Sequence, residues 1–336
     1  VANKDPGRTT CRDIWQAVKA PPCLGHTQRT IAIGIADDLC QHVMFLVGQI
    51  GQRAAHRTGI ATDHAHSRLD DGNGVSFAAI ADIEIRIEEF LEHARHGFIV
   101  INTRSGITMP KDLEGRRVGV QLYTMSAAMW IRGMLRHEYH VDLSTIRWVQ
   151  GAIDSAGSHG SPTVLPLLKQ PDIENNATDR SLSQLLEDGN IDAVLGATLP
   201  TGLGSHPDIA RLFSNFREIE TDYYRRTKIH PIMHLIVIRR DVHEANPHAA
   251  PALFDAFQKA KEIAMGHMRF TGALRYMLPF LPDDIDEIDR VFDGDPWPYG
   301  VALNRSTLEA EVQYMVEQNY ITKPMPIEDL FVAGIG

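Results

Sequence analysis

The sequence predicts an α/β protein, because strand-like and helix-like patterns alternate along the chain. The clearest unit is residues 112–150. Residues 117–121 alternate apolar and polar side chains as a strand does, and from residue 124 apolar side chains recur at three- and four-residue steps, as on one face of a helix. Residues 146–149 form a second strand pattern. A strand, a helix and a strand over this length predict a parallel crossover.

The remaining elements follow from similar local patterns. Residues 1–28 are polar and interrupted by prolines, which predicts a loose tail. Further strands are predicted at residues 30–34, 83–87, 98–101, 191–195 and 231–239, the last being the strongest in the C-terminal half. Helices are predicted at residues 37–50, at 181–188 with Gly189 as C-terminal stop, from Asn246-Pro247, and from Ser306 with Glu309 in capping-box spacing. Residues 56–74 and 151–180 are predicted loops.

Composition limits the function classes. A net charge of −10 over 336 residues argues against a nucleic-acid partner, and no apolar run is long enough to cross a membrane. Cys11, Cys23 and Cys40 are an odd, unclustered set, which favours reduced thiols. The first residues lack a basic segment followed by an apolar stretch, so a cytoplasmic location is expected.

The turn that opens the helix after residue 121 is a candidate anion site. Tyr123, Thr124 and Ser126 place hydroxyl groups and backbone N–H groups at a helix N-terminus. For Thr124 or Ser126 singly, a plain N-cap is the favoured explanation. Their joint position at the carboxyl end of a parallel strand strengthens the interpretation as a ligand site. In the following helix, Trp130 is predicted in the core and Arg132 on the solvated face.

Several stretches resemble one known family. They are DLEGRRVGV (112–120), YTMSAAMWIRGMLRHEY (123–139), LEDGNIDAVLGA (186–197), HPIMHLIVIRRDV (230–242) and DPWPYGVALNRSTLEA (295–310). Together they resemble 4,5-dihydroxyphthalate decarboxylases over roughly residues 94–332. Residues 1–90 lack the pattern with which this family opens its first lobe.

The resemblance implies a type II periplasmic-binding-protein-like fold, in which two crossing strands join two α/β lobes. Lobe 1 would comprise residues 29–101 and 230–336, and lobe 2 residues 102–229, with crossings near Phe98–Asn102 and Ile229–Ile238. The implied activity is that of a carboxy-lyase without a cofactor, which removes one carboxylate from 4,5-dihydroxyphthalate to give protocatechuate in phthalate degradation. The expected partner is a small aromatic dicarboxylate, and the sequence leaves a homo-oligomer open.

This reaction needs a group that binds the retained carboxylate and a group that transfers protons near neutral pH. Arg95 and His96 match the family's Arg-His pair, so Arg95 is predicted as a carboxylate clamp and His96 as a proton-transfer residue. An exposed charged pair at a strand start is an equal alternative. His234, inside the apolar run PIMHLIVI, is the second predicted proton-transfer residue, or else a buried histidine with one backbone partner. His230 is a weaker substrate-binding candidate.

A metal site and two rival functions are the alternatives to these predictions. Asp63, His64, His66, Asp70 and Asp71 offer metal-ligating atoms, but they lack a recognised spacing, so a solvated loop without metal is favoured. The rivals are a solute-binding protein that delivers an aromatic carboxylate to a transporter and an inactive relative that still binds ligand.

Overall fold

The computed structural model describes residues 75–80, 83–87, 95–160, 166–232, 235–238, 240–272, 276 and 278–335. It divides into two compact units. Among the described residues, the smaller unit comprises those from Ala252 to Glu287, and the larger unit comprises the others. The predicted tail at 1–28, strand at 30–34, helix at 37–50 and loop at 56–74 lie outside the described residues.

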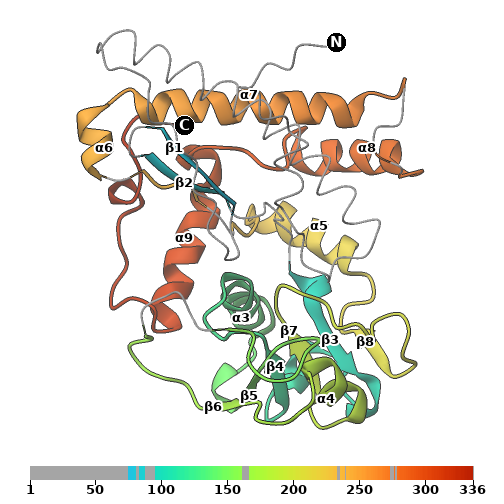
Figure 1. Cartoon of the computed structure of the whole chain (residues 1–336). Coiled ribbons are helices and arrows are strands. Elements are labelled where there is room, and N and C mark those ends of the chain that lie inside the picture. Colours follow the sequence, from blue (N-terminus) through green and yellow to red (C-terminus); the bar gives the residue numbers. More distant parts are fainter. Residues whose placement is uncertain are drawn as a thin grey trace, which may run out of the picture. The chain divides into compact units, whose positions relative to one another are not determined.

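The larger unit is built on a six-stranded sheet of order β6-β5-β4-β7-β3-β8 (Figure 1). Its strands are β3 (Ile99–Asn102), β4 (Arg117–Val120), β5 (Arg147–Gln150), β6 (Ile173–Asn175), β7 (Ala193–Leu195) and β8 (Ile209–Arg211). β4 pairs in parallel with β5 and β7, and β5 with β6, while β3 is antiparallel to β7 and β8. The predicted α/β class and the parallel crossover at 112–150 are therefore confirmed.

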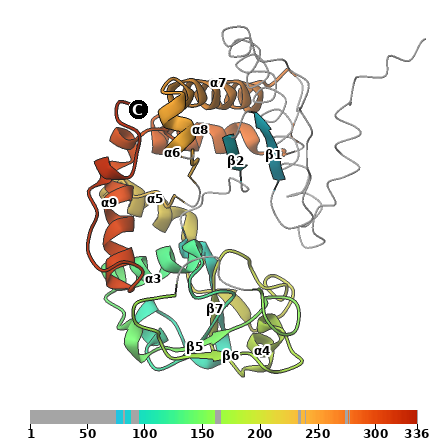
Figure 2. The same cartoon turned by 60° about the vertical axis from the view of Figure 1, so that its left-hand side comes forward.

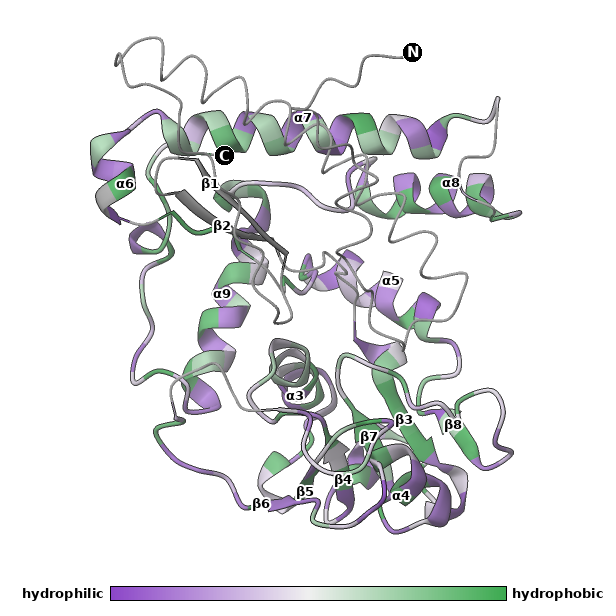
Figure 3. Ribbon diagram, in the orientation of Figure 1, coloured by the Kyte–Doolittle hydropathy of each residue, from purple (hydrophilic) through white to green (hydrophobic). Residues whose placement is uncertain are grey.

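Helices cover both faces of this sheet, because side chains of successive strand residues point to opposite faces. Ile99 and Ile101 of β3 pack with α3 (Ser126–Tyr139) in one apolar cluster. Val100, between them, packs with α4 (Leu182–Asp188) in a second cluster. Figures 1 and 2 show α3 and α4 on different sides of the strands, and Figure 3 shows the strands β3 and β7 as mainly hydrophobic. The larger unit thus has an α/β/α core.

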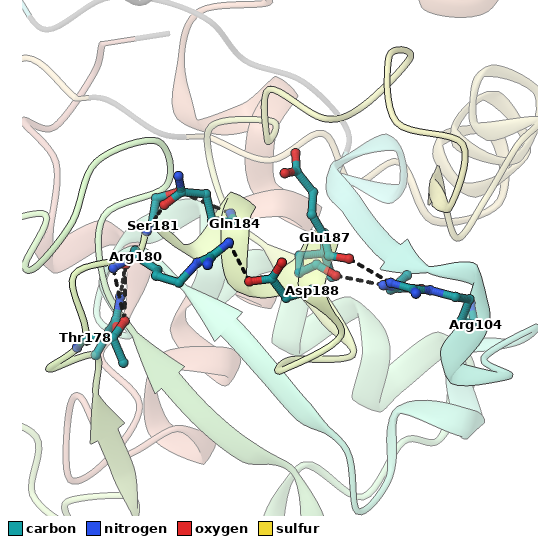
Figure 4. Close-up of polar contacts among 10 residues, drawn as sticks. Arg104, Thr178, Arg180, Ser181, Gln184, Glu187 and Asp188 are labelled. Atoms are coloured by element: carbon teal, nitrogen blue, oxygen red, sulfur yellow. Dashed lines mark hydrogen bonds and ion pairs between the residues drawn. The ribbon is translucent and has the colours of Figure 1, made fainter.

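α4 is fixed at both ends by polar contacts (Figure 4). Ser181 Oγ accepts a hydrogen bond from the backbone N–H of Gln184, and Gln184 Oε1 accepts one from the N–H of Ser181, which is a capping box. Gly189 ends the helix with φ of +78°, as predicted. Arg104 Nη2 donates to the carbonyl of Glu187 at 2.7 Å, so the helix end is also tied to the segment after β3.

Five further helices follow in the chain: α5 (Phe216–Thr227), α6 (Arg240–Ala245), α7 (Ala249–Arg269), α8 (Leu281–Phe292) and α9 (Val301–Glu317). α7 begins just after Asn246-Pro247, as predicted. α5, α6 and α8 were not predicted. None of the helices in the described part of the chain is both long and apolar enough to cross a membrane.

Two predictions for the C-terminal half are wrong. Described residues 231–232 and 235–238 form no strand, and the Leu235 and Val237 side chains are 53% and 63% exposed. The described part of this apolar run therefore pairs with no strand among the described residues. α9 begins at Val301, one turn before Ser306. The Asn304 side chain donates to the carbonyls of Pro298 and Gly300, which fixes the DPWPYG turn at the helix start.

The remaining strands, β1, β2 and β6, differ in how well the sequence predicted them. The strand β2 (Ile83–Ile87) was predicted, and it pairs antiparallel with β1 (Val75–Ile80), which was not. β6 lies inside the predicted loop at 151–180, where a strand of three residues gives too short a pattern to recognise.

Candidate ligand site at the carboxyl edge of the sheet

Amide and hydroxyl side chains meet at the carboxyl edge of the parallel strands. Gln121, the residue after β4, accepts a hydrogen bond from the N–H of Thr198 at 3.2 Å and donates to its Oγ1 at 3.3 Å. Gln150, the last residue of β5, accepts from the N–H of Tyr123 at 2.8 Å and donates to Asn175 Oδ1 at 3.4 Å. Thr198 and Asn175 are exposed, so this edge is polar and accessible. Open α/β sheets bind ligands at such an edge.

The helix-entry turn at this edge keeps its hydroxyl groups uncommitted. α3 begins at Ser126 with Met125 as N-cap, and no side chain caps it. The plain N-cap explanation is therefore wrong for both Thr124 and Ser126. Neither hydroxyl has a hydrogen-bond partner in the described part of the chain, and Ser126 is exposed. The first N–H groups of a helix of 14 residues lie beside them.

Tyr123 is buried between an aromatic ring and a guanidinium group. The Tyr123 ring meets the Trp148 ring edge-on, with 5.4 Å between their centroids. Arg132 Cζ lies 3.7 Å from the centroid of the Tyr123 ring. Arg132 is 0% exposed, so its predicted place on a solvated face is wrong. Gln318 Oε1 accepts from Arg132 Nε at 2.8 Å and Tyr320 Oη accepts from Nη2 at 3.2 Å, because the segment after α9 covers this face of α3.

The same face of α3 packs closely against α9. Trp130 is buried, as predicted, and its Nε1 donates to the carbonyl of Ile232 at 3.0 Å. Its ring meets that of Tyr314 edge-on at 5.5 Å. Gly133, one turn along, leaves the space that the Tyr314 ring occupies. α9 therefore holds α3 and its first turn in place.

His96 lies in an aromatic enclosure in front of β3, where η1 (His96–Phe98) leads into the strand. It is 1% exposed, and its ring meets those of Tyr139, Phe213 and Tyr223 edge-on at 5.9, 5.2 and 5.4 Å. Neither ring nitrogen has a hydrogen-bond partner among the described residues. Burial, assisted by the charge of Arg226, lowers the pKa of His96 to about 4, so the imidazole is neutral near pH 7.

Arg95 is also buried, so the exposed charged pair is ruled out. The carboxylate near it belongs to the protein itself. Glu220 Oε1 accepts from the N–H of Gly97 at 3.0 Å. Burial raises the pKa of Glu220 to about 7, against the lowering effect of hydrogen bonds from His96 and Gly97 and of the charges of Arg95 and Arg211. A role for Arg95 as a substrate clamp would have to be shared with Glu220.

Comparison with known proteins shows which family the chain resembles. Over 216 residues the chain is 33% identical to the 4,5-dihydroxyphthalate decarboxylase of Comamonas testosteroni, a match that covers 64% of this chain and 65% of that protein. Over 132 residues it is 32% identical to the enzyme of the same name from Pseudomonas putida, covering 39% of this chain and 51% of that protein. The chain resembles the 4,5-dihydroxyphthalate decarboxylase family over 64% of its length. The matches span between half and two thirds of the length of these relatives.

Two other comparisons add little to the family assignment. No protein-family model matches the chain. Among solved structures, the periplasmic aliphatic sulphonate binding protein SsuA from Escherichia coli is similar with a TM-score of 0.36 and 14% identity, over 72% of this chain and 70% of that chain.

The site residues predicted from the sequence fall into separate groups. Ile99 and Val120 both pair with Leu195, so His96, before β3, and Tyr123, after β4, lie toward the same edge of the sheet. Their contacts nevertheless differ, since His96 contacts the last residue of α3 whereas Tyr123 precedes the first turn.

The two predicted histidines of the C-terminal half, His230 and His234, are not among the contacts of His96 or Tyr123 described above. The ring of His230 meets Phe292 at 5.2 Å and Tyr224 at 6.2 Å, edge-on in both cases, and its backbone N–H donates to Thr307 Oγ1. His234 lies outside the described residues. The structure thus assembles Tyr123, Thr124 and Ser126, and the proton-transfer roles of His96 and His234 stay predictions.

Sequence reasoning missed Gln121, Gln150, Thr198 and Arg132. A signal was present for the two glutamines. Gln121 ends the first predicted strand of the parallel crossover and Gln150 directly follows the second, so both had to lie at its carboxyl edge. No such signal marked Arg132. Among the described residues no three His, Cys, Asp or Glu side chains form a group that could hold a metal, and Asp63 to Asp71 lie outside them.

Proposed function

We propose that this chain is a non-oxidative aromatic-acid decarboxylase that converts 4,5-dihydroxyphthalate to protocatechuate and carbon dioxide. The observation that carries the proposal is the 33% identity to a decarboxylase of that name over 216 residues. The polar edge and its helix-entry turn support it, because they suit a small aromatic anion.

The chemistry of the substrate requires only proton transfer. Each ring carboxylate is para to a hydroxyl group, so loss or weakening of that O–H bond moves electron density to the carbon that bears the carboxylate. That carbon takes up a proton, the bond to the carboxylate breaks, and carbon dioxide leaves. No electrons are gained or lost overall. The protein must hold the second carboxylate and move protons.

The described residues suggest how these tasks are divided. The retained carboxylate would accept hydrogen bonds from the hydroxyls of Thr124 and Ser126 and from the first N–H groups of α3. His96, with its pKa lowered to about 4, is in the neutral form that accepts a proton at pH 7. With His234 it keeps the predicted proton-transfer role. We further propose that the protein acts in the cytoplasm, in phthalate degradation.

The test is an incubation of purified protein with 4,5-dihydroxyphthalate, in which protocatechuate is followed by chromatography and carbon dioxide by mass spectrometry. We expect the two products in equal amounts. His96→Ala should lower kcat by about 10²-fold or more, a typical effect of losing a general acid–base group, while the dissociation constant of substrate changes only a few-fold. His248→Ala, which removes an exposed imidazole, should leave kcat unchanged.

Two outcomes would contradict this proposal. Saturable binding of 4,5-dihydroxyphthalate in calorimetry without any product would favour a solute-binding protein or an inactive relative. An unchanged kcat in His96→Ala would remove His96 from the reaction while leaving the decarboxylase assignment in place.

A further inference from the structure

Arg132 carries a positive charge that no carboxylate among the described residues balances. Its side chain is 0% exposed. No carboxylate among the described residues lies within ion-pair distance of it, and its Nη1 has no hydrogen-bond partner there. A buried guanidinium without an anion is strongly unfavourable, so buried charges are normally paired. Within the described part of the chain, Arg132 thus has no anionic partner.

The groups that hold Arg132 in place are neutral. Gln318 presents its oxygen to Arg132 because its amide nitrogen donates to the carbonyl of Met129 at 3.0 Å. Burial raises the pKa of the Tyr320 phenol, so Tyr320 is uncharged at neutral pH. Both partners fix the direction of the guanidinium, and neither supplies negative charge.

Arg132 is directed at the helix-entry turn. Side chains of a helix point toward its N-terminus, and the guanidinium lies 3.7 Å from the ring centroid of Tyr123. Tyr320 joins the two residues from the other side, since its hydroxyl accepts from Arg132 Nη2 and donates to the carbonyl of Tyr123 at 3.4 Å. The uncompensated charge thus lies directly behind the turn with the uncommitted hydroxyls of Thr124 and Ser126.

We propose that Arg132 is a fixed positive charge that makes this turn selective for aromatic carboxylates over neutral aromatic ligands. Arg132 is enclosed, so it acts across the Tyr123 ring as a positioning and electrostatic residue rather than by touching the ligand. Charges act strongly through such a protein interior, where solvent and salt screen them little. The proposal deepens the decarboxylase function and rests on it, because it names the group that favours a dicarboxylate.

Calorimetric binding to the full chain tests the proposal. The probes are phthalate, which carries both carboxylates but lacks the hydroxyls that decarboxylation needs, and catechol, which is neutral. In Arg132→Met we expect the affinity for phthalate to fall about tenfold or more, as for a lost charge-assisted interaction, and the affinity for catechol to stay within about twofold. Arg136→Met is the matched control: it removes a charge from the same helix, at a side chain that is 51% exposed, and should change neither affinity.

Arg132→Lys and Arg132→Gln separate charge from packing. Both lose the planar stack on Tyr123, but only lysine keeps the charge. We expect the lysine variant to bind phthalate at least about fivefold more tightly than the glutamine variant. This comparison also decides the matter if Arg132→Met does not fold.

Three results would overturn the role of Arg132: equal phthalate binding by the lysine and glutamine variants, full phthalate affinity in Arg132→Met, or wild-type protein that binds phthalate no better than catechol. The decarboxylase proposal fails separately. Its failure would be a protein whose phthalate binding depends on Arg132 but which forms no protocatechuate.

Discussion

Gly133 shows how one residue can set the distance between two helices. A Cβ atom built there would lie 2.2 Å from Tyr314 Cδ2, which is far inside van der Waals contact. We expect Gly133→Ala to destabilise the protein by about 1–3 kcal/mol, the usual range for overpacking, although alanine is the better helix former. Urea unfolding followed by circular dichroism measures this difference.

Gly266 provides the control for that substitution. It also lies inside a helix, α7, but no atom lies within 4 Å of a Cβ built there. Gly266→Ala should therefore stabilise its helix by about 0.5–1 kcal/mol. The same substitution is therefore expected to change the free energy of unfolding in opposite directions at the two positions. A stabilising Gly133→Ala would show that the Tyr314 ring can move aside at little cost.

Arg132 shows what a sequence pattern cannot tell about a residue. The helical pattern placed it on a polar face, and that face is indeed where its polar partners lie. However, Gln318, which covers it, is 186 residues away in the chain. Periodicity identifies which residues share a face of a helix, but it does not tell whether a later segment buries that face. Trp130 was easier to place, because a large apolar ring is rarely left in water.

At the scale of elements, two serines near helix starts are expected to differ. Ser181 is half of a capping box on α4, so Ser181→Ala should lower the free energy of unfolding by about 1 kcal/mol. Ser126 is exposed and caps nothing, so Ser126→Ala should leave stability unchanged and weaken phthalate binding instead. Thermal unfolding together with calorimetry compares the two. If Ser126→Ala lowers stability and leaves the affinity for phthalate unchanged, Ser126 has a structural role instead.

The elements that could be predicted are those whose signals are local. The unit β4–α3–β5 and the helix α4 with its stop at Gly189 follow from periodicity, caps and turn residues within a few positions. The strand predicted at 231–239 failed because an alternating apolar run does not show whether a partner strand is present. The start of α9 was placed too late because a capping-box pattern at Ser306 also fits the interior of a helix, and the Asn304 contacts were invisible.

For the whole molecule, the order and direction of the strands decide which residues share an edge. The sequence indicated parallel pairing for β4 and β5, but nothing in it placed β7 between β4 and β3 or reversed β3. That arrangement brings His96 and Tyr123 toward one edge. It also explains why the candidate site could be predicted only in part: the turn at 123–126 is local, whereas its amide neighbours and the charge behind it come from distant segments.

Two groups next to β3 should give the stability of the whole protein opposing pH dependences. The pKa of His96 is lowered from 6.5 to about 4, so between these values the unfolded chain binds more protons and the native state loses stability as pH falls. The pKa of Glu220 is raised from 4.5 to about 7, so the native state holds its proton longer and loses stability as pH rises through that range.

Unfolding by urea between pH 4 and pH 8 separates the two contributions. Relative to wild type, His96→Phe should gain stability progressively as pH falls from 6.5 to 4, by about 3 kcal/mol at the low end, since each pKa unit corresponds to about 1.4 kcal/mol. Glu220→Gln should show the opposite slope, gaining as pH rises from 4.5 to 7, because glutamine keeps the oxygen that Gly97 donates to but cannot ionise. A change in packing shifts the free energy of unfolding of a variant by the same amount at every pH, so it does not alter the pH dependence. Parallel curves for a variant and wild type would therefore mean that the group titrates alike in folded and unfolded chains, and that its surroundings are more polar than the contacts around β3 indicate.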